Sequence, residues 1–406
     1  MSCRHDAIVI GGGPAGSTAA ILLAQAGWSV ALVEKQVFPR RKVCGECIAA
    51  TNLPLLDELG ISEDFHELAG HELRQVALML GRHTVIADMP ALPHGRHAWG
   101  RALTREHLDT LLLQRAKTAG AQIFQPWSVR HISGGFGYYS CEIASAGSAA
   151  TRMLQAPVII AACGSWEPQS FMQSEKPPKL ASDLFAFKAN FQGAHLPAGL
   201  LPVLSFAGGY GGMVREGSGI MTLACCIRRD TLRACRARWP NASAAEAVEA
   251  YLSASCAGVE QALAGATRLG AWISVGPLRP GIRVGNRGHE FFLVGNAAAE
   301  AHPIIGEGIS MAMQSSWLLC RKLISCRNKI DASLMVIDKD YTRDWRRHFA
   351  ARLRLASLFA HLAMRPRLGN ALLPILQRWP GLITHGAYLS GKVRPLEWGP
   401  LHEELA

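Results

Sequence analysis

The chain has 406 residues, of which 49% are hydrophobic, and its formal net charge is +11. This length allows roughly two or three domains, and the hydrophobic content is ample for a large core. The sequence contains no uncharged apolar run of about 18 residues, which argues against a membrane-spanning helix, and it opens directly into a strand pattern instead of a secretory signal. We therefore expect a cytoplasmic protein whose 11 cysteines are reduced thiols rather than a disulfide framework.

The positive charge is concentrated near the C-terminus, where residues 321–400 contain 15 Lys or Arg and 5 Asp or Glu. Such a surface suits an acidic partner or carrier protein, or peripheral contact with an anionic membrane, and it suits a solvated face equally well. No nucleic-acid-binding motif accompanies it, so we do not expect nucleic acid as a partner.

The N-terminal stretch, residues 6–34, carries a dinucleotide-binding fingerprint. A buried strand precedes Gly11, Gly13 and Gly16, which satisfy G-x-G-x-x-G, and a helix and a second strand follow. The glycines allow a sharp turn and bring a pyrophosphate close to the helix N-terminus, and Glu34 follows where a carboxylate can bind an adenosine ribose. FAD is favoured over NAD because the motif lies at the extreme N-terminus and a second glycine-rich element follows near residue 300.

A basic cluster and two cysteines come after the fingerprint. Arg40, Arg41 and Lys42 are plausible charge partners of a pyrophosphate. Cys44 and Cys47 have the C-x-x-C spacing of a redox pair. However, no thioredoxin-like context surrounds them and no second cysteine pair for zinc is present, so no metal site is expected.

The pattern of the remaining chain changes from alternating strands and helices to antiparallel strands and then to helices. Strands are expected at residues 76–80, 84–89, 122–129, 156–162, 184–191, 220–227 and 290–294, a hairpin at 134–149, and helices at 105–119, 244–263 and 308–324. Later helices are expected to break at Pro366, Pro374 and Pro380. These elements predict an FAD-binding domain from residues 1–180 and 273–325, a substrate domain from residues 181–272 with contributions from 70–100, and a C-terminal helical region from 326–406.

A second strand, turn and helix pattern spans residues 291–316. It contains Gly295-Asn296-Ala297-Ala298, then Pro303, then Gly306-Glu307-Gly308. This stretch resembles the second FAD motif of flavoproteins with the p-hydroxybenzoate hydroxylase fold, which include aromatic hydroxylases, geranylgeranyl reductases and flavin halogenases. The resemblance also covers the N-terminal fingerprint, the basic cluster with its Cys-Gly-Glu, the helix from Arg105, and Cys163-Gly164-Ser165.

The resemblance implies an α/β fold. Its parts are a Rossmann-like FAD-binding domain of the p-hydroxybenzoate hydroxylase or glutathione reductase type, a substrate domain on an antiparallel sheet, and a C-terminal helical region. It implies FAD as cofactor and NAD(P)H as reductant, with Glu34 at the ribose, Arg105 near the pyrophosphate, Asn296 at the ribityl chain, and Gly308 and Ile309 at the isoalloxazine. The expected cofactor-binding residues are Gly11, Gly13, Pro14, Ala15, Gly16, Glu34, Lys35, Cys44, Gly45, Arg105, Val129, Gly295, Asn296, Gly306, Gly308 and Ile309.

Two positions depart from the family pattern. Asn296 replaces the usual aspartate, which keeps a hydrogen-bonding carbonyl but loses the charge. Cys163 replaces the aspartate of the family's middle D-G motif, which weakens the case for nicotinamide as the direct reductant. The W-x-W-x-I-P signature of tryptophan halogenases is absent, and this argues against halogenation.

We expect an FAD-dependent monooxygenase that hydroxylates an aromatic or polyketide-like substrate with O₂ and NAD(P)H. The alternatives are an alkene reductase of the geranylgeranyl reductase type, and a flavoprotein that modifies a protein-bound substrate through a basic docking face.

Three residues are candidates for the chemistry and for substrate contact. His302 lies in the turn expected to approach the flavin and is a candidate catalytic residue, although it could simply cap its own turn. Tyr210 and Met213, in a glycine-rich segment, are candidate substrate contacts, although this segment could be a plain hairpin. We expect the C-terminal helices to cover the substrate domain rather than to form an interface for lipid-like substrates.

Overall fold

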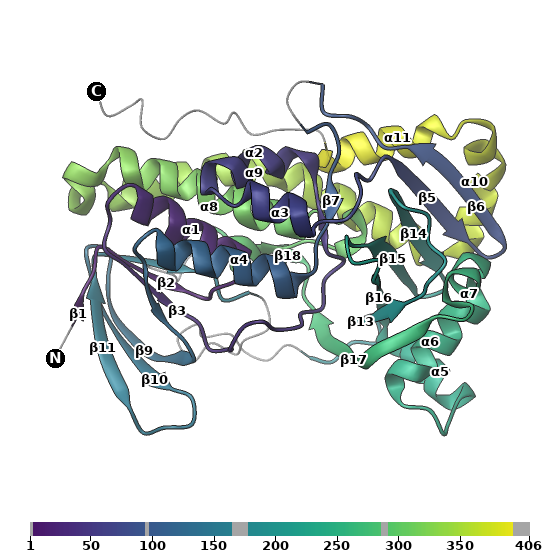
Figure 1. Cartoon of the computed structure of the whole chain (residues 1–406), viewed down its shortest axis with the longest axis horizontal. Helices are drawn as coiled ribbons and strands as arrows, with labels where there is room; N and C mark the ends of the chain where they lie inside the picture. The colour runs from purple at the N-terminus through teal and green to yellow at the C-terminus, as the bar shows by residue number, and fades with distance from the viewer. Residues whose placement is uncertain (1–2, 94–96, 165–177, 286–290, 393–406) are drawn as a thin grey trace.

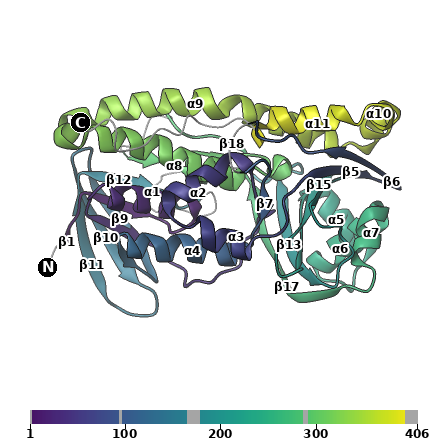
Figure 2. The same ribbon diagram turned by 45° about the horizontal axis from the view of Figure 1, so that its top comes forward.

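The computed structural model describes residues 3–93, 97–164, 178–285 and 291–392 (Figure 1). Two large sheets lie side by side along the long axis of the molecule. The helix α9 (Ile330–Ala363) runs along the same axis beside both of them (Figure 2). The two sheets therefore share one helical layer.

The first sheet is parallel and holds the N-terminal fingerprint. Its strands are β2 (Ala7–Ile10), β3 (Val30–Val33), β8 (Gln122–Phe124), β12 (Val158–Ala161) and β19 (Phe292–Leu293), in the order β19-β12-β2-β3-β8. The helices on one face are α1 (Pro14–Gln25), α4 (Arg105–Thr118) and α8 (Gly308–Ser325). A small sheet of β1 (Cys3–Arg4), β9 (Trp127–Gly135), β10 (Tyr138–Ser145) and β11 (Thr151–Ala156) covers the other. In β2, Ala7 and Val9 pack toward the helices, whereas Ile8 and Ile10 pack toward the small sheet. Burial on both faces explains why these strands are continuously apolar.

The second sheet is antiparallel except where β14 pairs with β5. Its strands are β5 (Gln75–Leu80), β6 (His83–Asp88), β13 (Leu184–Gln192), β14 (Leu200–Phe206), β15 (Gly209–Arg215), β16 (Met221–Arg228) and β17 (Thr267–Leu278), in the order β17-β13-β16-β15-β14-β5-β6. The helices α5 (Arg229–Arg238), α6 (Ala244–Ser255) and α7 (Ala257–Leu263) pack on one face. On the other face, Ala186, Tyr210 and Cys226 pack with Ala360 of α9.

Short elements connect the two sheets. They are β4 (Cys47–Ile48), α2 (Leu53–Leu59), α3 (Ser62–Leu68), β7 (Arg101–Ala102), β18 (Gly281–Ile282), β20 (Ala299–Glu300) and a 3₁₀ turn at Pro303–Ile305. The described chain continues with α10 (Pro366–Arg378) and α11 (Gly381–Ala387), which lie over β5 and β6 at one end of the molecule (Figure 1). Residues Tyr388–Lys392 follow and contact α9. Among the described residues, no helix has both the length and the apolar composition needed to cross a bilayer.

This architecture confirms the predicted α/β fold class, and several local predictions need correction. The strand expected at 122–129 is divided between β8 and β9 at Pro126, because proline has no N–H to donate to a strand ladder. The hairpin expected at 134–149 turns earlier, and β10 already ends at Ser145. The strand expected at 290–294 is limited to Phe292–Leu293, and residue 290 lies outside the described residues.

Two predictions about helices also need correction. Pro366 and Pro380 mark helix boundaries as predicted, but Pro374 lies inside α10. The carbonyl of Asn370 loses its helical donor there, and Asn370 is exposed, so water can take the donor's place. The helix α5 was not predicted. The strand β17 crosses residue 272, the expected end of the substrate domain, and the domain boundaries themselves stay a prediction.

Candidate functional site

A cavity of about 590 Å³ runs from the glycine turn after β2, between the two large sheets, to the helices α10 and α11. Nearly all the residues that the sequence predicts for the site line this cavity. They are Gly11, Gly13, Pro14, Ala15, Glu34, Lys35, Cys44, Gly45, Arg105, Val129, Tyr210, Met213, Gly295, Asn296, His302, Gly306, Gly308 and Ile309. Gly16 does not line it. Cys163 and Gly164 do, whereas Ser165 lies outside the described residues.

The glycine turn needs its glycines for backbone packing. Gly11 has a φ of 105°, which favours glycine, and a Cβ on Gly16 would lie 1.8 Å from the carbonyl oxygen of Gly11. Glu34 closes the turn, because its carboxylate accepts hydrogen bonds of 2.8 Å from the backbone N–H groups of Gly12 and Gln36. Gly16 therefore shapes the turn without facing the cavity.

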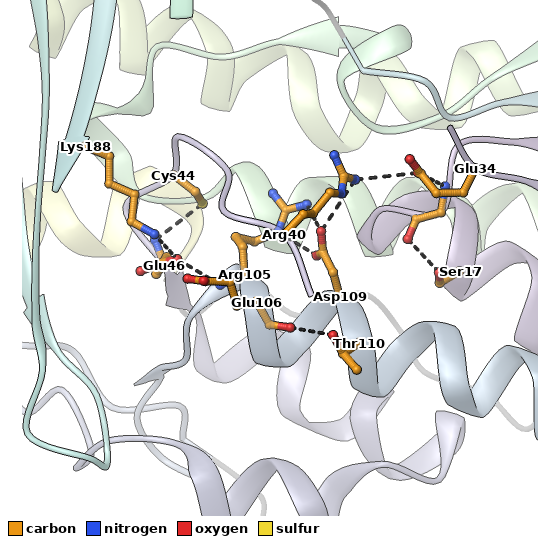
Figure 3. Close-up of polar contacts among 11 residues, drawn as sticks. Ser17, Glu34, Arg40, Cys44, Glu46, Arg105, Glu106, Asp109, Thr110 and Lys188 are labelled. Atoms are coloured by element: carbon orange, nitrogen blue, oxygen red, sulfur yellow. Dashed lines mark hydrogen bonds and ion pairs between the residues drawn. The ribbon is translucent and has the colours of Figure 1, made fainter. Parts of the chain in front are cut away.

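Two guanidinium groups lie beside this turn (Figure 3). Arg105 donates two hydrogen bonds of 2.7 Å to Asp109, and Nη2 of Arg40 lies 3.6 Å from both Glu34 and Asp109. Burial alone would lower the pKa of Arg105, but Asp109 raises it above its ordinary value. Nε of Arg40 is buried without a hydrogen-bond partner. A Cβ on Gly13 would lie 3.5 Å from Arg105 and 3.8 Å from Arg40. The turn thus offers positive charge and an unused donor to a pyrophosphate.

The second glycine motif follows β19 and reaches the same cavity at the same edge of the parallel sheet as the first motif. A Cβ on Gly295 would lie 2.9 Å from Cβ of Ala15 in α1, so the two motifs pack directly against each other. Gly308 begins α8 and Gly45 lies in the loop before β4, and neither has a neighbouring atom within 4 Å of the position of a Cβ. The N-terminus of α8 and this loop therefore border open space in the cavity. The unpartnered Nε of Arg40 beside the first turn and the open space at Gly45 and Gly308 fit FAD as the cofactor.

A buried ion pair that the sequence analysis missed fixes the loop before β4. Glu46 has a φ of 57°, rare outside glycine, and is 1% exposed. Its carboxylate pairs with Lys188 of β13, and it also accepts hydrogen bonds from the Thr222 hydroxyl at 2.6 Å and the Arg105 backbone N–H at 2.8 Å. Lys188 is the one charged residue within the apolar pattern of β13, and that position in the sequence was the available signal.

A second lysine reaches the site from the C-terminal segment. Nζ of Lys392 lies 3.2 Å from Glu307 and 3.6 Å from Sγ of Cys47, and Lys392 lines the cavity. Burial favours the neutral amine, but Cys47 and Glu307 raise the pKa of Lys392 above its ordinary value. The charge of Lys392 is therefore retained beside Gly306. Nothing in the local sequence predicts this contact.

Tyr210 and His302 form the polar pair of the substrate side. The Tyr210 hydroxyl and Nδ1 of His302 are 3.1 Å apart, and both side chains are buried. Burial, with a contribution from His361, lowers the pKa of His302 to about 4, and burial raises the pKa of Tyr210 well above its ordinary value. At neutral pH both groups are therefore uncharged. The His302 side chain does not cap the 3₁₀ turn that follows it, and it instead joins this turn to β15.

Between this pair and α11 the cavity wall is mostly apolar. The lining residues come from β5 and β14 on one side and from α9, α10 and α11 on the other. They include Val76, Leu78, Leu80, Leu201, Val203, Phe359, Leu362, Leu372, Leu376, Leu382 and Ile383. This part of the cavity suits an apolar molecule.

Comparison with known proteins gives a family match for the first part of the chain. Residues 4–176 match the family model described as an FAD binding domain. Tryptophan 2-halogenase from Chondromyces crocatus is 36% identical over 118 residues, which are 29% of this chain and 22% of that protein. The 1H-pyrrole-2-carbonyl-[peptidyl-carrier protein] chlorinase from Pseudomonas fluorescens is 48% identical over 139 residues, 30% of this chain and 31% of that protein. The chain thus aligns with less than a third of the length of either relative.

Solved structures match over nearly the whole chain. The myxobacterial chondrochloren halogenase CndH superposes with a TM-score of 0.75 at 18% identity and covers 98% of this chain and 99% of its own. A geranylgeranyl bacteriochlorophyll reductase-like protein from Thermoplasma acidophilum gives 0.65 at 17% identity, with 96% of this chain and 100% of its own covered. At these identities the likeness shows the fold.

The fold and the glycine-lined cavity define the protein as a flavoprotein with the p-hydroxybenzoate hydroxylase fold, which confirms the resemblance read from the sequence. Residues 4–176 form an FAD binding domain, and the solved structures show that the whole chain has the fold of FAD-dependent enzymes.

Proposed function

We propose that this protein is a monooxygenase-class enzyme that uses FAD and O₂ to introduce an electrophilic substituent, oxygen or halogen, into an electron-rich ring of an apolar molecule. The observation that carries the proposal is the position of the Tyr210–His302 pair. It lies where the apolar part of the cavity meets the second glycine motif, so one polar group of an apolar substrate can be held at that end.

The residues of this chain orient the ring and handle its proton. The Tyr210 hydroxyl can hydrogen-bond a phenolic oxygen of the substrate, and the neutral imidazole of His302 can take up a proton as the ring is substituted. Leu362, Leu376 and Ile383 exclude water from the same space. FAD, when bound, supplies the two-electron chemistry with oxygen. Arg40, Arg105 and Glu34 would hold its adenosine diphosphate end, and Gly45 and Gly308 would border its ring.

The two outcomes differ in the fate of the oxygen atoms. In hydroxylation, a ring C–H bond is replaced by C–OH, the second oxygen atom leaves as water, and the reductant supplies two electrons. In halogenation, a halide ion gives up two electrons, the reductant supplies two more, a carbon–halogen bond replaces C–H, and both oxygen atoms leave as water. The halogenases among the relatives and the solved structures support the second outcome, so the missing W-x-W-x-I-P signature is not enough to exclude it.

A single-turnover experiment tests the proposal. FAD-loaded protein is reduced with dithionite, or with NADPH to test the predicted reductant, and mixed with ¹⁸O₂-saturated buffer containing para-octylphenol, with or without bromide. If the enzyme hydroxylates, mass spectrometry should show one ¹⁸O atom in the product formed without bromide. If it halogenates, the product formed with bromide should contain bromine and no ¹⁸O. Hydrogen peroxide as the only product under every condition, with this phenol and with para-ethylphenol, would overturn the proposal.

An alkene reductase is the second candidate, because the elongated apolar wall would also fit a prenyl chain. Reduced protein held under argon with geranylgeraniol should leave this alkene unchanged if the oxygenase proposal holds. Saturation of a double bond without oxygen would favour the reductase instead.

A further inference from the structure

The helices α10 and α11 expose an apolar patch beside the end of the cavity. Leu368, Leu372 and Ile375 follow the spacing that places residues on one face of α10, and Trp379 comes one turn later, before Leu382 in α11. These five side chains, which we call the α10–α11 patch, are between 43% and 59% exposed. Leu373 is the buried residue of α10 and packs inward. Five large apolar side chains that are exposed on neighbouring helices indicate a binding surface.

The patch is surrounded by positive charge. From Trp345 to Lys392 the sequence contains no Asp or Glu, and Arg365, Arg367 and Arg378 are exposed at the two ends of α10. The exposed Asp88 of β6, whose backbone carbonyl accepts a hydrogen bond from Thr384 of α11, is an acid that borders this region. Basic residues around leucine, isoleucine and tryptophan side chains are typical of helices that lie in the interface of an anionic bilayer.

The patch and the cavity share residues. Leu372 and Leu382 line the cavity and are also 43% and 49% exposed, so at α10 and α11 the cavity wall is also part of the outer surface. Gly369 permits this arrangement: a Cβ there would lie 2.8 Å from Leu80, so α10 packs closely on β5 at that point. An apolar molecule could therefore pass from a bilayer into the cavity without crossing water.

We propose that the α10–α11 patch docks on an anionic lipid bilayer and that the cavity takes its substrate, a lipid-soluble molecule, directly from that bilayer. The lipid-soluble character of the substrate deepens the function proposed above and rests on it, whereas docking on the bilayer does not. An acidic carrier protein would match the charge, but it would not account for a row of aliphatic and tryptophan side chains beside an apolar opening. Figure 2 shows α10 and α11 at the end of the helical layer, away from the parallel sheet.

Vesicle co-sedimentation tests the docking step with the full chain loaded with FAD. The protein should bind vesicles of phosphatidylglycerol and phosphatidylcholine and bind pure phosphatidylcholine much more weakly. Ile375→Gln/Trp379→Gln should lower the binding at least about tenfold. Arg365→Gln/Arg378→Gln should lower it about thirtyfold, since each arginine contributes about 1 kcal/mol near an anionic surface. None of these four residues lines the cavity.

Matched variants elsewhere control for general effects of surface change. Tyr138→Gln/Met153→Gln removes exposed apolar side chains from β10 and β11 at the other end of the molecule, and Arg233→Gln/Arg236→Gln removes two exposed charges from α5. Both should bind anionic vesicles like the unchanged protein. Equal losses in the control and patch variants would overturn the docking proposal. So would retention by an immobilised acyl carrier protein together with no binding to vesicles.

Turnover separates this inference from the proposed function. Para-octylphenol supplied in anionic vesicles should be converted several times more slowly by Ile375→Gln/Trp379→Gln, while para-ethylphenol in buffer should be converted at an unchanged rate. Conversion in buffer without any binding to vesicles would leave the proposed function intact and overturn the docking. Binding to vesicles without conversion of either phenol would leave the docking intact and overturn the proposed function.

Discussion

Lys188 of β13 pairs with Glu46 of the loop that borders the second glycine motif, and both side chains are almost completely buried. The pair joins the substrate sheet to the FAD-binding part of the chain. Because Glu46 also accepts a hydrogen bond from the backbone of Arg105, this single carboxylate connects β13, the loop and the first turn of α4. The relative position of the two sheets at the cavity therefore depends on it.

Removing the lysine should destabilise the protein strongly. Lys188→Met leaves the Glu46 carboxylate buried without its counter-ion, and we expect a loss of about 3–5 kcal/mol in the free energy of unfolding, measured by urea denaturation. Lys188→Met/Glu46→Gln should recover much of that loss, because no uncompensated charge is left. A single variant as stable as the unchanged protein would contradict the role assigned to this pair.

A methyl group at the start of α8 should block FAD while leaving the fold intact. Gly308→Ala places a Cβ in the open space that we assign to the flavin ring, so FAD affinity, measured by flavin fluorescence titration, should fall at least about tenfold. The stability of the protein without FAD should change by no more than about 1 kcal/mol. Gly381→Ala at the start of α11, which is equally unobstructed, is the control and should leave the affinity unchanged. Normal affinity in Gly308→Ala would mean that the ring lies elsewhere.

Loss of the Tyr210 hydroxyl should affect turnover without affecting the cofactor. Tyr210→Phe removes the group that we expect to hold the substrate's polar end, and product formation from para-octylphenol should fall about a hundredfold with FAD affinity unchanged. Ser205→Ala is the matched control, since this cavity-lining hydroxyl donates to the backbone of Ala363 instead. Full activity of Tyr210→Phe would remove Tyr210 from the proposed mechanism.

Protonation of His302 should lower the free energy of unfolding in acid. Burial lowers its pKa from 6.5 to about 4, so the unfolded chain takes up a proton before the folded protein does. The contribution of the neutral imidazole is fully present above pH 6.5 and is lost as the pH falls toward 4, with a total of up to about 3 kcal/mol. Urea denaturation between pH 4 and 7 should show this slope in the unchanged protein and a flatter one in His302→Gln. Parallel slopes would show that the histidine titrates normally.

The residues of the nucleotide-binding half of the site could be predicted from the sequence one by one. The strand, the glycine turn, the helix and Glu34 follow one another within about 30 residues of chain. A local pattern was therefore sufficient to predict this motif. The second motif near Gly308 was found in the same way, and the structure brings it to the same cavity. Pro374 and α5 were misjudged because exposure to solvent and packing on the second sheet decided them, and neither is visible in a short window.

By itself, the sequence determined the α/β class, the FAD-binding family resemblance and 18 residues that line the cavity, because each of these depends on neighbours along the chain. Only the tertiary structure decided that Lys188 neutralises Glu46, that Lys392 lies beside Cys47, that Tyr210 meets His302, and that α10 and α11 form both a wall and an exposed apolar patch. The three side-chain contacts join residues that are 92 to 345 positions apart in the sequence. Their energies come from burial and charge pairing that exist only after the chain has folded.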